Sequence, residues 1–173
     1  VLVAGVADLH VVGVVAGDGV VLLALVEVEF HRDDSLGLAG AGARIARAAA
    51  DAASTPERPR YVLGSMGPGT KLPSLGHTTY ARLRDAYQQQ AEAMIAGGVD
   101  GFQVETCQDL LQARAAVNGV RRAREAAGVD LPVFVNVTVE TSGSMLLGSE
   151  IGAALTALEP LGIDAIGLNC GTG

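Results

Sequence analysis

The chain has no tryptophan and few aromatic residues of any kind, which make up 3% of its 173 positions. Base stacking on aromatic rings is therefore disfavoured, and no block of Lys or Arg residues is present to follow a phosphate backbone. Twelve basic residues stand against 19 acidic ones, giving a net charge of −7. We expect no nucleic-acid partner.

Cysteine is also scarce. Cys107 and Cys170 are too few for a secreted disulfide scaffold, and they are typical of reduced thiols in a cytoplasmic protein. The apolar stretch 1–28 is interrupted by acidic residues, glycines and a histidine, and it has no basic leader region. We therefore expect a cytoplasmic protein with no membrane segment.

Small aliphatic residues dominate the chain, and 49% of it is hydrophobic. This composition favours helices packed closely on a sheet, an α/β fold. Near the start, the runs 11–16 and 20–28 predict two strands, with Gly17-Asp18-Gly19 forming a tight turn between them. An Ala-rich helix is predicted over 38–53 and ends before the prolines that follow.

From residue 60 onward, strand and helix patterns alternate. Strands are expected at 61–65, 99–105, 132–139 and 165–169, with helices at 80–96, 110–127 and 150–161. This spacing is typical of successive βαβ units. The dinucleotide-binding glycine fingerprint is absent, and a complete barrel needs about 250 residues. Such units build either a doubly wound sheet or a (β/α)8 barrel, and the absent fingerprint weakens only the dinucleotide-binding form of the first. As a barrel, the single domain 1–173 would be an incomplete (β/α)8 TIM barrel with about six of its eight units.

Each predicted strand in this regular part ends in polar residues. The carboxyl ends of parallel strands meet at one edge, so these side chains should surround a common pocket. They are Ser65, Glu105, Asn136 with Thr138, and Asn169 with Cys170.

The residues alone leave the roles of two of these side chains open. Cys170 could be a metal ligand, a nucleophile or an inert buried thiol, and no local motif supplies a base or further ligands. Glu105 could bind a substrate ammonium group, because a carboxylate ending an apolar strand is costly unless it is paired or used. Capping of the following helix explains Glu105 almost equally well.

Four stretches together resemble the homocysteine-binding domain of cobalamin-dependent methionine synthases. They occur in the family's order from about Arg44 to the end, whereas residues 1–40 match poorly. The stretches are Gly64–His77, Val104–Ala113, Val137–Met145 and Gly167–Cys170.

The resemblance implies a barrel in which three cysteines and the homocysteine thiolate bind zinc. Cys170 matches the first of these cysteines, and the other two would lie beyond Gly173. Glu105 matches the acidic residue that holds the homocysteine amino group. Asn169 and Ser65 are further substrate-binding candidates, and Asp18 is a possible counterpart of the family's first Asp-Gly turn. Because the nucleophile would be the substrate thiolate, no catalytic side chain is expected.

In this family the methyl group comes from methylcobalamin, which is recharged from methyltetrahydrofolate. Both cofactors are carried on modules absent from this chain, which are its expected partners. The implied activity is methyl transfer to homocysteine to give methionine, with the fragment inactive by itself. Two alternatives stay open: a cobalamin-independent homocysteine methyltransferase using betaine or S-methylmethionine, and a non-catalytic barrel fragment.

Overall fold

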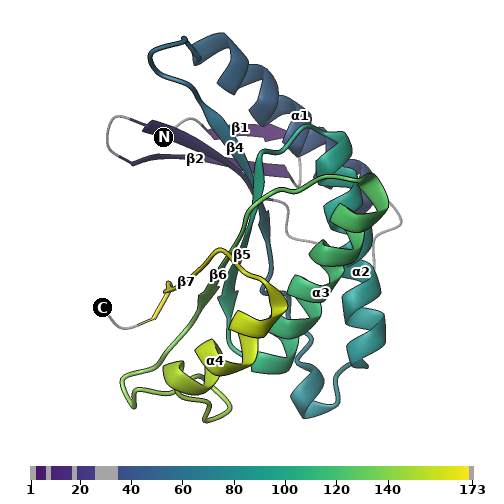
Figure 1. Ribbon diagram of the computed structural model, residues 1–173, viewed down its shortest axis with the longest axis vertical. Coiled ribbons are helices and arrows are strands. Elements are labelled where there is room, and N and C mark those ends of the chain that lie inside the picture. Colours follow the sequence, from purple (N-terminus) through teal and green to yellow (C-terminus); the bar gives the residue numbers. More distant parts are fainter. Residues whose placement is uncertain (1–2, 7–8, 17–18, 26–34, 172–173) are drawn as a thin grey trace.

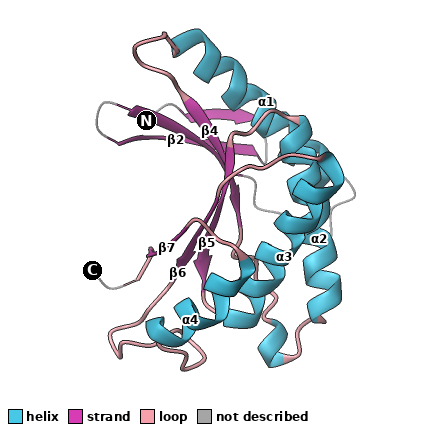
Figure 2. Ribbon diagram, in the orientation of Figure 1, coloured by secondary structure: helices cyan, strands magenta, loops and turns pink. Residues whose placement is uncertain are grey.

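The computed structural model describes residues 3–6, 9–16, 19–25 and 35–171, and they form one seven-stranded sheet in the order β1 to β7 (Figures 1 and 2). The strands are β1 (Val3–Val6), β2 (Leu9–Ala16), β3 (Gly19–Leu25), β4 (Tyr61–Met66), β5 (Gly101–Cys107), β6 (Val133–Val137) and β7 (Ala165–Leu168). The helices are α1 (Ser35–Ala53), α2 (Tyr80–Ala96), α3 (Leu110–Ala127) and α4 (Ile151–Leu158), with short 3-10 turns η1 (Pro73–Leu75) and η2 (Glu159–Leu161).

The sheet changes direction at β3. Strands β1, β2 and β3 run antiparallel, and Ala16 pairs with Gly19 across the predicted turn. From β3 to β7 every neighbouring pair is parallel. The described residues therefore contain four βα units followed by β7. The expectation of about six units was too high, because β1 and β2 form a meander with β3 and have no crossover helix between them.

All four helices lie on one side of the curved sheet (Figure 2). Alternate residues of β4, β5 and β6 face them and are fully buried, among them Val62, Phe102, Val104 and Val135. Neighbouring helices also pack closely through small residues: a Cβ at Gly97, which caps α2, would lie 2.4 Å from the Cβ of Ala43 in α1. The opposite side chains of the same strands project from the other face, where the polar strand ends lie.

Helices α2 and α3 have the predicted bounds, and each begins with a side-chain cap. Thr79 accepts a hydrogen bond from the backbone of Arg82, and Asp109 accepts one from that of Leu111. The predicted helix 150–161 is instead divided into α4 and η2. Pro160 has no backbone N–H to continue the α-helical ladder, so the last turn tightens.

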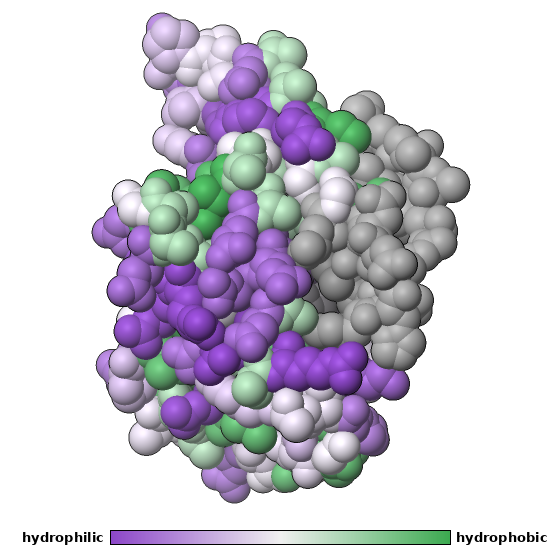
Figure 3. All heavy atoms as spheres, turned by 90° about the vertical axis from the view of Figure 1, so that its right-hand side faces the viewer, coloured by the Kyte–Doolittle hydropathy of each residue, from purple (hydrophilic) through white to green (hydrophobic). Residues whose placement is uncertain are grey.

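The outer surface of the helical layer is largely hydrophilic, with small apolar patches between the charged side chains (Figure 3). None of the helices in the described part of the chain is both long and apolar enough to cross a membrane.

Candidate functional site

Three side chains predicted at the strand ends meet at the carboxyl edge of the sheet. Ser65 at the end of β4 donates a short hydrogen bond through Oγ to Oε1 of Glu105 on β5. The other carboxylate oxygen, Oε2, accepts a hydrogen bond of 3.0 Å from Nδ2 of Asn169, which follows β7. Ser65 is buried and Glu105 is half-buried, so the carboxylate is fixed on both oxygens without being sealed from solvent.

An irregularity in β5 sets the direction of this carboxylate. The register of β5 against β6 shifts between Val104 and Cys107, and the intervening Thr106 has a φ of 58°. The shift means that β5 has one residue more than β6 over this stretch, a β-bulge. A bulge bends the strand and changes the direction of its side chains. The backbone N–H of Thr106 donates to Oδ1 of Asn169 at 3.0 Å, which links β5 directly to the chain after β7.

Two threonines complete the network, and neither was named among the candidate ligand-binding residues. The hydroxyl of Thr106 lies 3.5 Å from Sγ of Cys170, to which it donates. Thr138 is buried after β6, and its hydroxyl donates to the backbone carbonyl of Asn169 at 3.1 Å. Thr138 was expected at this rim, whereas nothing in the sequence alone distinguished Thr106 from an ordinary residue at a strand end.

The two cysteines have opposite environments. Cys107 is completely buried, and this burial, reinforced by the carboxylates of Asp109 and Glu105, raises the pKa of its thiol to about 12. Cys170 is exposed at the rim with a φ of 51°. A buried neutral thiol is inert, so Cys170 is the thiol available for chemistry.

The glycine-rich loop that follows β4 is held beside the rim. The carbonyl of Pro68 accepts hydrogen bonds from Tyr87 Oη, at 3.1 Å, and from Nε2 of Gln112. Farther along, Asp109 accepts hydrogen bonds from both the backbone N–H and the hydroxyl of Ser74. The start of the loop is therefore tied to α2 and α3, and its later part to the N-cap of α3.

The described residues contain no cluster of three or more His, Cys, Asp or Glu side chains able to hold a metal ion. Cys170 is therefore a single potential thiolate ligand within this part of the chain. Asp18, the remaining candidate, lies outside the described residues.

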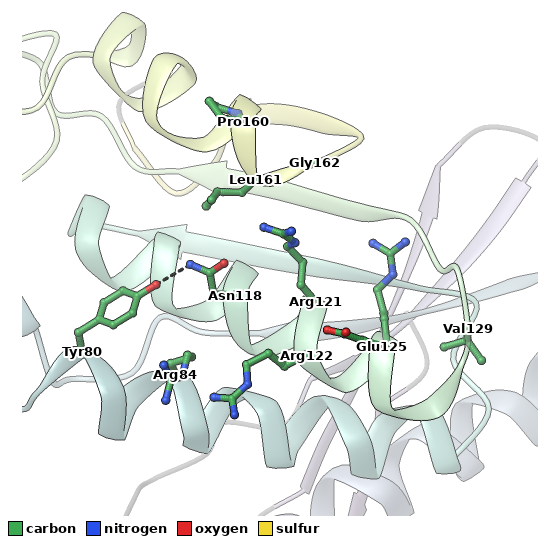
Figure 4. A pocket seen from close by; sticks show the side chains of 11 residues that line it. Tyr80, Arg84, Asn118, Arg121, Arg122, Glu125, Val129, Pro160, Leu161 and Gly162 are labelled. Carbon is green, nitrogen blue, oxygen red and sulfur yellow. Dashed lines mark hydrogen bonds between the residues drawn. The ribbon is translucent and has the colours of Figure 1, made fainter.

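A separate groove of about 680 Å³ lies on the helical side of the sheet, between α2, α3 and η2 (Figure 4). Four arginines line it, but their charge is partly neutralised. Asp85 pairs with Arg84 and Arg122, and these arginines hold the pKa of its carboxyl below the ordinary value. Arg124 pairs with Asp130. None of the rim residues lines this groove, so it is distinct from the candidate site.

The chain belongs to the homocysteine S-methyltransferase family, whose model matches residues 23–172. Within the family it is 67% identical to the methionine synthases of Mycobacterium tuberculosis (strain ATCC 25618 / H37Rv) and Mycobacterium leprae (strain TN). Each match extends over 132 residues, 76% of this chain, and covers 11% of the relative. The chain thus spans about a tenth of the length of these curated relatives.

Solved structures share the fold. The apo form of the homocysteine methyltransferase MmuM from Escherichia coli matches with a TM-score of 0.68 at 20% identity, covering 87% of this chain and 56% of that one. A metallated form of the same enzyme matches with a TM-score of 0.62 at 21% identity, covering 79% and 49% of the two chains. At this identity the likeness supports the architecture alone.

Proposed function

We propose that this chain is the homocysteine-binding part of a methionine synthase and presents homocysteine as a zinc thiolate for methyl transfer from methylcobalamin. The observation that carries the proposal is the carboxylate of Glu105, fixed by Ser65 and Asn169 at the same rim as the exposed thiol of Cys170. The 67% identity to two methionine synthases favours this function over the betaine and S-methylmethionine alternatives.

Glu105 is suited to bind the substrate amino group. Each of its carboxylate oxygens already accepts a hydrogen bond from a neutral donor, which fixes the direction of the side chain without adding a positive charge. None of the ion pairs among the described residues involves Glu105, so within this part of the chain its charge is left for an incoming ammonium group. A half-buried position would strengthen that ion pair relative to one in open solvent.

Cys170 fits zinc as one thiolate ligand, because it is exposed at the rim and soft sulfur is a preferred donor for this metal. A complete site needs ligands beyond those of the described residues, and we propose that they are two further cysteines. When bound, zinc would keep the homocysteine thiol deprotonated near neutral pH. The chain's own contribution is to place Cys170 and Glu105 so that the sulfur and the amino group of one substrate molecule reach both.

We further propose that residues 1–173 belong to one (β/α)8 barrel domain whose remaining units lie elsewhere in a longer parent enzyme. The parallel run β3 to β7 and the placement of all helices on one face support this view. Ile151 and Leu155 of α4 and Leu168 of β7 are exposed and apolar, as expected of surfaces that further units would cover. The cobalamin- and folate-binding modules of the parent would be the partners of this domain, in the cytoplasm.

Calorimetric titration of homocysteine into the zinc-loaded parent enzyme tests the proposal. Glu105→Gln keeps the size of the side chain and removes its charge, so we expect binding to weaken at least about tenfold, the loss of one charge-assisted contact. The matched control is Glu92→Gln on the outer surface of α2, where Glu92 accepts a hydrogen bond only from Gln88. Equal affinities for Glu105→Gln and the unsubstituted enzyme would refute this role for Glu105.

A further inference from the structure

Thr106 has a backbone conformation that needs explaining. Its φ of 58° lies in the left-handed region, which β-branched residues rarely adopt. A residue is held in such a conformation only where its surroundings impose it, and such positions cluster at functional sites. The contacts made by Thr106 therefore bear on why a threonine occupies this place.

The hydrogen-bond network fixes the direction of each of these contacts. Oδ1 of Asn169 accepts from the backbone N–H of Thr106, and Nδ2 donates to both Glu105 Oε2 and Thr106 Oγ1, the latter at 3.2 Å. The reversed amide would turn its oxygen toward the Glu105 carboxylate and its NH₂ group toward the N–H of Thr106. Both contacts would be repulsive, so only the observed orientation satisfies the network.

With the amide in this orientation, the Thr106 hydroxyl accepts from Asn169 and keeps its proton to donate elsewhere. Oγ1 accepts from Asn169, which can only donate through Nδ2, and the single hydroxyl proton is then free to point toward Sγ of Cys170 at 3.5 Å. A thiolate carries no proton and can only accept. Hydrogen bonds therefore run outward from the Asn169 amide, on one side to the Glu105 carboxylate and on the other through the Thr106 hydroxyl to the sulfur of Cys170, and so connect the two proposed ligand groups.

We propose that Thr106 is a positioning residue for Cys170, whose sulfur it holds in one orientation at the rim by donating a hydrogen bond from its hydroxyl. The inference rests on the proposed role of Cys170 as a zinc ligand. Cys170 is exposed, and among the described residues the hydrogen bond from Thr106 is the one that its sulfur makes. Groups that hydrogen-bond to a metal ligand orient it and tune its donor strength.

The test uses the parent enzyme loaded with Co²⁺, which reports thiolate ligation through its charge-transfer absorption. Thr106→Val removes the hydroxyl at nearly constant volume, and Thr106→Gly removes it while suiting the positive φ, so the pair guards against misfolding. Thr106→Ser keeps the hydroxyl. Thr156→Val is the control, because Thr156 donates only to the carbonyl of Gly152 on the exposed side of α4.

We expect Thr106→Val and Thr106→Gly to release cobalt to a chelator about tenfold faster and to shift the thiolate band to lower energy. Thr106→Ser and Thr156→Val should match the unsubstituted protein. The inference would be overturned if Thr106→Val and Thr106→Gly left both the thiolate band and the rate of cobalt release unchanged. It would also be overturned if Thr106→Ser released cobalt as fast as those two variants. A thiolate band unaltered in Cys170→Ala would instead refute the proposed zinc role of Cys170, whatever the Thr106 variants show.

Discussion

Asn169 is the residue on which the geometry of the rim depends most. Its amide forms three side-chain hydrogen bonds, to Glu105 Oε2 and to the N–H and Oγ1 of Thr106, and these tie β5 to the chain after β7. Asn169→Ala removes all three. A neutral hydrogen bond contributes about 1 kcal/mol and one to a charged group about 1.5–3 kcal/mol. Since the site is half-buried and water can replace part of the loss, we expect the free energy of unfolding to fall by about 2–4 kcal/mol.

Urea unfolding followed by circular dichroism measures this change in free energy. Two further variants show whether the loss is specific to the hydrogen bonds of Asn169. Asn118→Ala is the matched control, because Asn118 makes one hydrogen bond, of 2.6 Å to Tyr80 Oη, on the helical surface. It should cost about 1 kcal/mol or less. Asn169→Asp keeps an acceptor for the N–H of Thr106 but places a second carboxylate beside Glu105. The loss in free energy of unfolding caused by Asn169→Asp should be largest near neutral pH. It should shrink in acid, where protonation of a carboxylate relieves the repulsion between the two side chains.

The account of Asn169 would be refuted if Asn169→Ala cost no more than Asn118→Ala. It would be refuted equally if Asn169→Asp were as stable as the unsubstituted chain near neutral pH, because two adjacent carboxylates without a proton or cation between them cannot both be accommodated there at no cost.

Two further predictions concern the core. Burial raises the pKa of the Cys107 thiol to about 12 in the folded protein, whereas the ordinary value is 9.0. Between these two pH values the unfolded chain loses a proton that the folded protein keeps. The free energy of unfolding should therefore fall by about 1.4 kcal/mol per pH unit in this range. Cys107→Ala should remove this part of the alkaline slope in urea unfolding, and an identical slope would contradict the burial argument. Gly119→Ala would place a Cβ 2.8 Å from the backbone of Arg84 and of Gln88, so thermal unfolding should show a loss of at least about 1–3 kcal/mol. Gly152→Ala, which meets nothing within 4 Å in α4, should instead be neutral or stabilising, and equal effects of the two would rule out the proposed clash.

Local signals in the sequence were sufficient for the regular elements. Helix α2 begins at the capped Tyr80 and ends before Gly97, as the pattern predicts, and α3 has both of its predicted bounds. The division of α4 from η2 was also accessible, since Pro160 lies inside the predicted helix. The proximity of Ser65, Glu105 and Asn169 followed from the rule that parallel strands end at a common edge, and the structure confirms it.

Features that depend on pairing between distant segments could not be predicted. The register shift in β5 exists only relative to β6, so no pattern around Thr106 announces its positive φ or its contact with Cys170. The tight turn predicted at Gly17-Asp18-Gly19 already implied one antiparallel pair of strands, but β1 was not predicted, and counting the N-terminal strands as βα units made their number too high. The role of Asp18 stays a prediction, because this residue lies outside the described segments.

Zinc content tests the central claim most directly. In the parent enzyme, Cys170→Ala should lose the bound zinc and, with it, tight homocysteine binding, if the exposed thiol at the rim is a metal ligand as we propose. Cys107→Ala should keep a full equivalent of zinc, since Cys107 is buried away from the rim surface and its raised pKa keeps it a neutral thiol. Retention of zinc by Cys170→Ala, or its loss from a folded Cys107→Ala, would contradict the account.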